Sequence, residues 1–423
     1  MGGKAERFFL PVAIGFAPFI LLALTWAPEG RTLFQVLMLR FYLPIVAVEL
    51  FVIAIAFREG MVAAMRQWTW SRIPSIALAV LLAAAIGTAI AAPNPGAARL
   101  WTAFWLIHLL FGFSVAHLAA KGAAPRDVIA SYLAGFVAFV AGCLIFASQV
   151  RNPAFDWTHD WPAITHIRHF GYYAAAMMAL GIGVSAGERP PLSRILLFLI
   201  GTVGFTFALW TGSRGAVIAV ACALFAGVLV IPALRRPLVW GSTLLALVIG
   251  GLVASQLPAH GPWMGFGRTI TQTVGSEDVS SGRTQIWINA IGAIRERPIF
   301  GYGENQMATV APFHGLGQTH NVVLQVLLAW GLVGLICVAV LGFWFLIRTM
   351  AIVRREPDVV GPPFLAMVAL ASLAAFDGSL FHVVPLSIFA ACAGMIASRW
   401  PTREVAGVAP QRTTDHPAEA GSA

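Results

Sequence analysis

Long apolar runs recur along the whole chain, and they constrain its fold more than any other feature. Each run has roughly 17 to 25 residues, the length that an α-helix needs to cross the hydrocarbon core of a bilayer. About twelve runs meet this criterion. Only 11% of the residues are charged, whereas soluble domains have about 25%. The sequence therefore predicts an all-α polytopic membrane protein, with spans that begin near Phe8, Leu33, Pro74, Arg99, Asp127, Arg168, Pro191, Arg214, Pro237, His320, Pro362 and Val383.

The basic residues predict an orientation for these spans. Most of the 27 lysine and arginine residues fall in the termini and in alternate connections if the N-terminus is placed in the cytoplasm. This is the asymmetry of the positive-inside rule, so both termini are expected to be cytoplasmic. The same rule explains the net charge of +9 without nucleic acid. We expect residues 1–400 to form one transmembrane helical domain and the polar residues 401–423 to be a disordered cytoplasmic tail.

One connection on the outer side is much longer than the others. It covers residues 257–319, between the ninth and tenth predicted spans. Apolar residues at helical spacing predict a helix over residues 284–297, which Pro298 ends, and Gly301-Tyr302-Gly303 predicts a turn. Loops of this length in a compact protein are usually functional, so we expect part of an active site here.

The segment that joins this loop to the tenth span carries the strongest candidate residue. It reads Gln318-Thr319-His320-Asn321, with Gly331 further along the span. A lone histidine at a helix end is more often structural. The adjacent asparagine, the position at a span boundary and the glycines, which would allow close helix packing, favour a functional role. An unperturbed histidine has a pKa near 6.5 and can remove a proton from a hydroxyl at neutral pH.

Three arginines are expected on the same outer side as this histidine. Arg214 starts a span between Gly212 and Gly215, Arg283 precedes the loop helix, and Arg168 starts an earlier span. Each could be an interface anchor or a solvated residue. Together they favour binding of a diphosphate or another anion, because guanidinium groups match its oxygens.

Other polar residues carry weaker signals. Glu304 is expected to be a solvated loop carboxylate, and Arg40 and Glu49 fall inside the second span, where charged residues are often functional. Asp377 and His382 flank the last outer loop and could support the site from behind. We predict no metal site, because the group Asp156, His159, Asp160, His166 and His169 has no recognised metal-ligand spacing. The four cysteines lie in apolar runs and are interpreted as core residues.

At the start of the tenth span the pattern is His320, Asn321, nine residues, Gly331, two residues and Gly334. This pattern resembles a motif of the O-antigen ligase family. Its superfamily also contains O-antigen polymerases and bacterial O-linked oligosaccharyltransferases. The resemblance covers the whole predicted topology.

Two further stretches support the resemblance, and two positions depart from it. Residues 282–287, with Pro298 and the 301–303 turn, are similar to the loop signature of the superfamily. Arg214 is followed four positions later by Ile218, where the family has leucine. Many members carry an acidic residue shortly before the first glycine, where this chain has Ala329-Trp330, so no role is assigned there.

The resemblance implies a membrane glycosyltransferase, similar to the GT-C type, in the bacterial inner membrane. It implies transfer of a glycan from a polyprenyl (undecaprenyl) diphosphate carrier to lipid A–core at the periplasmic face. No metal, cofactor or nucleotide sugar is implied, and direct attack would invert the anomeric carbon. The implied catalytic residues are His320, Arg214 and Arg283, and the implied substrate-binding residues are Asn321, Arg168, Trp287, Gly301, Gly303 and Gln318.

Three alternatives remain open. The motifs separate a ligase poorly from a polymerase that joins repeat units on the same carrier. A third enzyme of the superfamily would transfer the glycan to protein. A transporter for the lipid-linked glycan is less consistent with the sequence, because it has no internal repeat and its long polar segments lie on one side.

Overall fold

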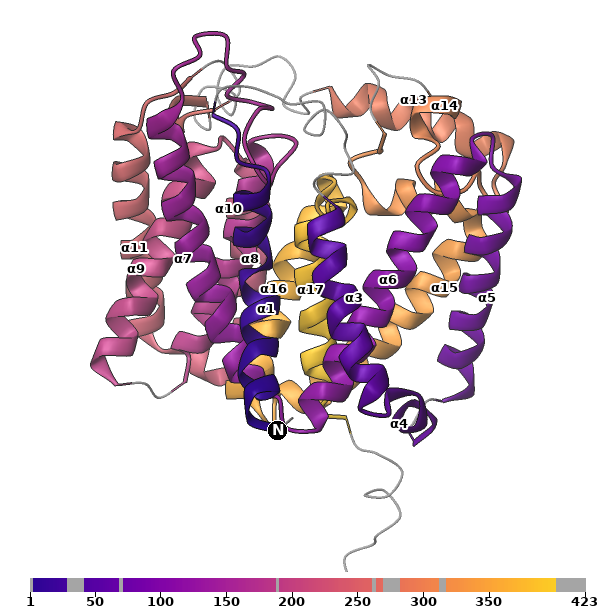
Figure 1. Ribbon diagram of the computed structural model, residues 1–423, viewed down its shortest axis with the longest axis horizontal. Coiled ribbons are helices and arrows are strands. Elements are labelled where there is room, and N and C mark those ends of the chain that lie inside the picture. Colours follow the sequence, from indigo (N-terminus) through magenta and orange to yellow (C-terminus); the bar gives the residue numbers. More distant parts are fainter. Residues whose placement is uncertain are drawn as a thin grey trace, which may run out of the picture.

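The protein is a bundle of roughly antiparallel helices in a computed structural model (Figure 1). The structure describes residues 3–28, 42–67, 71–187, 190–260, 264–268, 282–311 and 317–400. No β-strand occurs within these ranges. The helices are α1 Gly3–Leu24, α3 Leu43–Arg58, α4 Met61–Gln67, α5 Arg72–Ala91, α6 Pro95–Ala120, α7 Pro125–Gln149, α8 Arg168–Ser185, α9 Pro191–Trp210, α10 Arg214–Val230, η2 Pro232–Arg235, α11 Pro237–Gln256, α13 Arg283–Glu296, α14 Met307–Val310, α15 Val322–Val353, α16 Pro357–Phe376, η3 Ser379–Phe381 and α17 Val383–Ala397.

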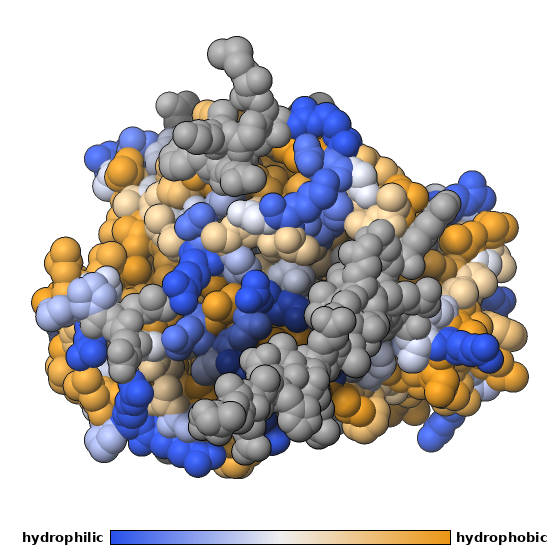
Figure 2. Space-filling view, turned by 90° about the horizontal axis from the view of Figure 1, so that it is seen from below, coloured by the Kyte–Doolittle hydropathy of each residue, from blue (hydrophilic) through white to orange (hydrophobic). Residues whose placement is uncertain are grey.

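The apolar character of these helices confirms the predicted class of polytopic α-helical membrane protein. Among the described residues, seven helices are long and apolar enough to cross a membrane, and α10, α17 and residues Phe9–Leu24 of α1 form shorter apolar helices. Figure 2 looks at the bundle along its helices: hydrophobic residues form most of the rim, and hydrophilic residues gather toward the middle. The number of membrane crossings, and the place of the long loop between the ninth and tenth, remain predictions.

Several helices begin where the sequence predicts a span to begin. This holds for α8, α9, α10, α11 and α17, which start at an arginine, a proline or a valine that follows a polar connection. The second predicted span contains α3, which begins at Leu43, while its predicted start near Leu33 falls on residues that the structure does not describe. Residues 29–41, which include Arg40, lie outside the described part of the chain, as do the predicted tail residues 401–423.

The centre of the bundle is formed by α8 and α16. Every residue of α8 from Phe170 to Gly183 is buried. The two helices approach closely because Gly183 has no side chain: a Cβ there would lie 2.5 Å from the Cα of Pro362. This packing fixes the start of α8, with Arg168, beside the end of α16, with Asp377. The core thus determines which polar residues meet at that end of the bundle.

A buried polar pair joins α3 to α6 within the apolar bundle. Glu49 is 1% exposed and His108 is 2% exposed, and the His108 Nδ1 lies 2.8 Å from the Glu49 carboxylate. A carboxylate in such surroundings needs a partner, because burying an isolated charge is costly. The sequence marked Glu49 as unusual but did not indicate His108 as its partner.

Helix α15 is broken at Gly331, and residues 298–303 replace the hydrogen bonds that the break removes. Gly331 has φ 63° and ψ −161°, which is not helical. Unpaired backbone groups are costly at membrane depth, so a break is tolerated only where other protein groups satisfy them. The replacement bonds run from Tyr302 N to Leu328 O (2.8 Å), from Gly303 N to Ala329 O (2.8 Å), from Leu332 N to Pro298 O (2.8 Å) and from Val333 N to Ile299 O (3.2 Å).

The break in α15 shows that Gly331, the first glycine of the tenth-span motif, has a different role from the one expected. Close packing of a continuous helix was the prediction for Gly331. In the structure a Cβ at this residue would lie 2.2 Å from the Ile299 carbonyl oxygen, so glycine is needed for both the backbone angle and the contact with the loop. At Gly334 a Cβ would lie 2.3 Å from the Trp330 Cβ, one turn earlier.

The described part of residues 257–319 contains a helix at the predicted place. Helix α13 spans Arg283–Glu296, one residue earlier at each end than predicted. In Figure 1, α13 and α14 lie at the end of the bundle opposite the N-terminus, outside the long helices. At this end α13 packs against the start of α15 and brings Arg283 toward the helix ends.

Candidate functional site

Asp377 lies at the centre of the polar residues at this end of the bundle. It directly follows α16 and is 4% exposed. Its Oδ1 accepts hydrogen bonds from His320 Nδ1 at 3.0 Å and from Gly378 N at 2.8 Å. Its Oδ2 accepts one from Arg283 Nη2 at 2.8 Å. Side chains from α13, from the turn before α15 and from the end of α16 therefore meet on one carboxylate.

These partners keep Asp377 ionised. Burial alone would raise its pKa, but the hydrogen bond from His320 and the charge of Arg283 hold the pKa well below its usual range, and Tyr172 of α8 adds a further hydrogen bond. An ionised carboxylate only accepts hydrogen bonds, so the His320 Nδ1 carries the proton between the two groups. In the neutral ring this tautomer has its lone pair on Nε2, to which no described residue hydrogen bonds. His320 is thereby set up to accept a proton at Nε2.

His320 has a backbone conformation that is rare for residues other than glycine. Its φ is 52°, in the left-handed region, where strain of order 1–3 kcal/mol persists only if the surroundings hold it. Asn321 supplies part of this support as the N-cap of α15. Its Oδ1 accepts from Leu324 N at 3.0 Å, and its Nδ2 donates to Ala375 O at 2.8 Å. Both ends of the Asn321 amide are thus occupied by the protein, and contact with a substrate remains a prediction.

Two hydrogen bonds hold Thr319, the residue before His320. The Trp287 Nε1 donates to Thr319 O at 3.1 Å, which ties α13 to the turn. Thr319 N donates to Gln325 Oε1 at 3.0 Å, within the first turns of α15. Trp287, predicted to contact substrate, therefore also positions the turn that presents His320.

The environment of Glu304 differs from the prediction of a solvated carboxylate. Glu304 is 3% exposed, and burial raises its pKa to about 7 although hydrogen bonds with Asn305, Gln325 and Trp105 act in the opposite direction. Pairing of residues 298–303 with α15 carries Glu304 inward against α6 and α15. Because Gln325 also bonds Thr319, Glu304 is linked through one side chain to the residue before His320.

Four arginines gather at this end of the bundle: Arg168 and Arg268 each lie within electrostatic range of Arg214 and Arg283, and Arg168 also lies within range of Asp377. They are the three predicted ones, Arg168, Arg214 and Arg283, and Arg268 of the segment after α11. Arg268 is 8% exposed, and burial, followed by the charges of the other three, lowers its pKa to about 9. A group of guanidinium side chains suits an anionic ligand, because the paired N–H donors of each match phosphate or carboxylate oxygens.

Sequence reasoning missed Arg268 and did not identify the partners of Asp377. Arg268 had the same signal as the others, an arginine on the expected outer side, but it lies in no motif. Asp377 was expected to support the site from behind, and in the structure it does so by bonding directly to both His320 and Arg283.

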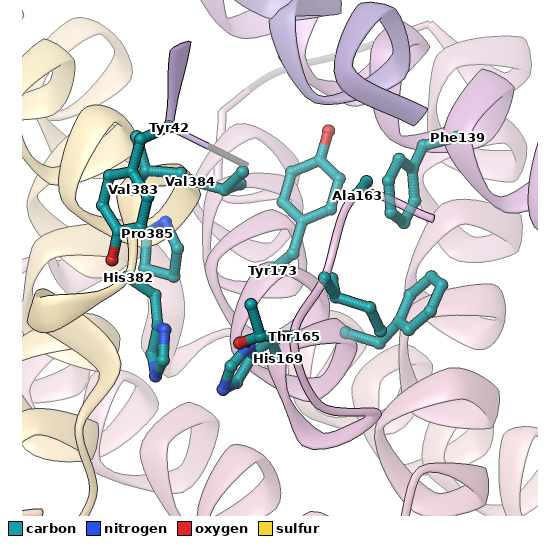
Figure 3. Close-up of a pocket in the computed structure, with 12 residues that line it drawn as sticks. Tyr42, Phe139, Ala163, Thr165, His169, Tyr173, His382, Val383, Val384 and Pro385 are labelled. Carbon is teal, nitrogen blue, oxygen red and sulfur yellow. The ribbon is translucent and has the colours of Figure 1, made fainter. Parts of the chain in front are cut away.

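A group of histidines borders the site on its other side. His382 and His169 have ring centroids 3.6 Å apart, and Figure 3 shows the two rings side by side at one edge of a small pocket whose other labelled residues are mostly apolar or aromatic. Burial, followed by the charge of His320, lowers the pKa of His382 to about 3, so its ring is neutral at neutral pH. The Gln318 Nε2 donates to the His382 Nε2 at 3.1 Å. Gln318 is thus placed between His382 and the turn that carries His320.

Two further histidines, His159 and His166, belong to the connection before α8. Burial, followed by the charge of Arg168, lowers the pKa of His166 to about 3. His159 pairs with Asp156 at 2.9 Å on the surface. In the described ranges of the chain, no three His, Cys, Asp or Glu side chains are arranged to hold a metal ion.

Gly301 and Gly303 do not join the arginines and His320. Their φ angles are 71° and 92°. A Cβ at Gly301 would lie 2.6 Å from Leu328 O, and one at Gly303 would lie 2.9 Å from Thr88 O of α5. Both glycines allow residues 298–303 to pack against the break in α15. This contact lies about two helical turns from the start of α15. A direct contact of these glycines with substrate remains a prediction.

The fold and this site define a class: a helical membrane protein with a histidine–aspartate pair beside a cluster of arginines. Comparison with known proteins is consistent with that class. The family model described as O-Antigen ligase matches residues 195–339. This segment contains Arg214, Arg283 and His320 but not Asp377. An O-antigen ligase of Pseudomonas aeruginosa is 30% identical over 152 residues, which cover 33% of this chain and 36% of that protein.

These matches confirm the resemblance that the tenth-span motif indicated. Residues 195–339 are therefore similar to the O-antigen ligase family. The aligned region spans about a third of the Pseudomonas protein.

Proposed function

We propose that the protein is a glycosyltransferase that moves a glycan from a polyprenyl diphosphate carrier to a hydroxyl group of lipid A–core. The observation that carries this proposal is the bond between His320 and Asp377 beside four arginines. A general base next to a strongly cationic group suits a reaction in which a hydroxyl loses a proton and a diphosphate leaves.

In the proposed step His320 acts as the general base. Its Nε2 takes the proton of the acceptor hydroxyl while the oxygen attacks the anomeric carbon of the glycan. The bond between that carbon and the carrier's phosphate oxygen breaks, and its electron pair leaves with the diphosphate. Asp377 stabilises the imidazolium that forms and keeps the proton on Nδ1. A single displacement of this kind inverts the anomeric configuration.

The arginines are proposed to bind the diphosphate and to stabilise the charge that develops on it. Arg214 and Arg283 are the leading candidates, because both belong to the matched family segment and both act electrostatically on Arg168. Guanidinium groups offer paired donors that match phosphate oxygens. In this role they supply the charge neutralisation that a divalent ion supplies in other enzymes that act on diphosphates. The step needs no metal, and we propose a reaction without one.

The acceptor and the location are inferred from the family. Ligases of this kind suggest lipid A–core as the acceptor, an active site at the periplasmic face of the bacterial inner membrane and cytoplasmic termini. The runner-up is an O-antigen or exopolysaccharide polymerase, which would use the same donor chemistry with a second lipid-linked glycan as acceptor. Transfer to protein hydroxyls and transport of the lipid-linked glycan are less favoured, and transport would leave the His320–Asp377 pair without a role.

Deletion of the gene tests the proposal. Lipopolysaccharide and the polyprenyl-linked glycan pool are analysed separately, with strains that express the wild-type chain or His320→Ala at equal levels. We expect long polymer to accumulate on the carrier while lipid A–core loses it, and His320→Ala to fail to restore transfer. Core that still receives single repeat units but no long chains would identify a polymerase. Full restoration by His320→Ala would overturn the role of His320.

A further inference from the structure

A second pocket lies at the opposite end of the bundle from His320. It is formed by the end of α8 and the starts of α9 and α11, and its volume is about 140 Å³. Helix α8 runs from Arg168 at the candidate site to Ser185 at this pocket, so the length of a span separates the two. The pocket is therefore independent of the proposed reaction.

Two glycines, which have no side chain, leave the space of this pocket open. Gly181 of α8 is buried within the bundle, yet a Cβ on it would meet no atom within 4 Å. Gly201 of α9 would meet only the Cβ of Ala246, at 3.8 Å. Interiors of proteins are normally close-packed, so open space beside a buried helical residue is unusual. A larger residue at Gly181 would project into the pocket.

The lining of the pocket combines two cations with apolar walls. Arg194 and Arg236 lie at the starts of α9 and α11, and none of the described lining residues is acidic. The Arg236 Nη1 contacts Ala186 O at 3.5 Å, which turns its guanidinium toward the end of α8. The hydroxyl groups of Ser242 and Thr243 both donate to Val239 O, so they offer no donor to a ligand. Among the described lining residues, the charged donors are therefore the two arginines.

We propose that this pocket binds one anionic phospholipid from the leaflet opposite the candidate site. The lipid phosphate lies between Arg194 and Arg236, and an acyl chain follows the apolar wall that contains Leu197, Phe198 and Leu238. Three features on the pocket favour a lipid over a free anion. The arginines lie at helix ends, where a bilayer has its headgroups; the walls below them are apolar; and Leu238 is 63% exposed toward the outside of the bundle.

Lipid binding to the purified protein tests this proposal. The full chain is delipidated in detergent and titrated with phosphatidylglycerol, cardiolipin or phosphatidylethanolamine, and bound lipid is measured by native mass spectrometry. We expect wild-type protein to retain the two anionic lipids in preference to phosphatidylethanolamine. Arg194→Gln/Arg236→Gln should bind them about thirtyfold more weakly, since each basic residue near a membrane surface contributes roughly a fivefold factor.

A matched control removes the same charge from the same end of the bundle. Arg235→Gln/Arg354→Gln changes two exposed arginines outside the pocket. The Arg235 side chain already donates to Val228 O at 2.9 Å, and Arg354 follows α15. This control should keep the wild-type lipid affinity. Equal weakening by both double variants would mean that only surface charge matters, and the proposal would fail.

A second variant keeps the test decisive if the double substitution disturbs folding. Gly181→Leu fills the pocket without changing any charge, and it should reduce retention of anionic lipid while the protein remains monodisperse. Retention by Gly181→Leu at wild-type levels would overturn the proposal. Displacement of the lipid by inorganic phosphate at equal concentration would do so as well, because it would reveal a site for a free anion.

Discussion

His320 and Asp377 are joined by a hydrogen bond of 3.0 Å between the turn that starts α15 and the residue that ends α16. The two residues are 57 positions apart in the chain, and α15 and α16 pack against each other to bring them together. Asp377 uses its other oxygen for Arg283. The proposed base and one of the proposed phosphate-binding residues are therefore oriented by the same carboxylate.

Asp377→Asn should slow glycan transfer by about 10²–10⁴-fold, because an amide no longer fixes the histidine tautomer or stabilises the imidazolium. The measurement is the initial rate with purified protein, lipid-linked donor and acceptor. Asp358→Asn, at the exposed other end of α16, is the control and should keep the wild-type rate. A wild-type rate for Asp377→Asn would show that the pair does not take part in the reaction.

The low pKa of Asp377 also defines a pH window. A carboxyl group whose pKa is lower in the folded protein than in the unfolded chain stabilises the fold. This contribution is fully present above the ordinary carboxyl pKa of 3.8, and it is lost as the pH falls through the lower pKa of the folded protein. Asp377 therefore stays ionised throughout the neutral range. The Asp377→Asn defect should accordingly be present at every pH from about 5 to 9.

Arg214→Lys and Arg283→Lys should each reduce transfer by about 10- to 100-fold, because an ammonium group cannot reproduce the paired donors of a guanidinium. Arg283→Lys should lower kcat more, since Arg283 also bonds Asp377. The measurement is kcat and the KM for the donor. Arg295→Gln, exposed in the last turn of α13, provides the control. Unchanged kinetics for Arg214→Lys would mean that Arg214 only anchors α10.

Glu304→Gln should reduce the dependence of thermal stability on pH. The pKa of Glu304 is raised from 4.5 to about 7, so between these values the folded protein holds a proton that the unfolded chain has released. Stability of the wild type should therefore fall as the pH rises through this interval, and level off above it. The variant has no such proton to lose. Unfolding temperatures at pH 5 and pH 8 provide the measurement.

The control for Glu304 is Glu59→Gln, which removes a partly exposed carboxylate that pairs with Lys121. It should leave the pH dependence of the wild type in place. An equal slope for wild type and Glu304→Gln would contradict the raised pKa.

Gly331→Ala should destabilise the protein by about 2 kcal/mol or more. Alanine at this residue would need a left-handed φ and would place its Cβ against Ile299 O. Gly342→Ala is the matched control in the same helix, where a Cβ meets no atom within 4 Å. The control should be neutral or stabilising, because alanine favours the helix. Equal unfolding temperatures of the two variants would mean that the break in α15 is not required.

The sequence was sufficient to predict the helices, because their cause is local. An apolar run of sufficient length, bounded by a proline or an arginine, predicted the starts of α9, α10 and α11 to the residue. Helix α13 was predicted within one residue from its apolar spacing and Pro298. His320, Arg283 and Arg214 were predicted as one site because loop charge placed them on one side of the membrane.

What the sequence did not reveal depends on contacts between distant segments. The bonds of Asp377 to His320 and Arg283 were not predicted, because nothing local shows that α16 ends beside the start of α15. Glu304 seemed solvated because Gly301-Tyr302-Gly303 indicates a turn in a polar loop, and no periodicity shows that this turn pairs with a broken helix. Gly331 was interpreted as a helix-packing residue because nothing local shows that α15 breaks there.

The joint between residues 298–303 and the break in α15 has a consequence for how this protein can vary. All four of its hydrogen bonds run between main-chain atoms, so they do not depend on which side chains Ile299, Tyr302 or Leu332 carry. Exchange of those side chains should preserve the attachment of the loop that aligns His320. The positions of this joint that cannot change are the glycines with positive φ, Gly301, Gly303 and Gly331, where a side chain would meet both a strained backbone angle and a main-chain atom of a neighbouring segment.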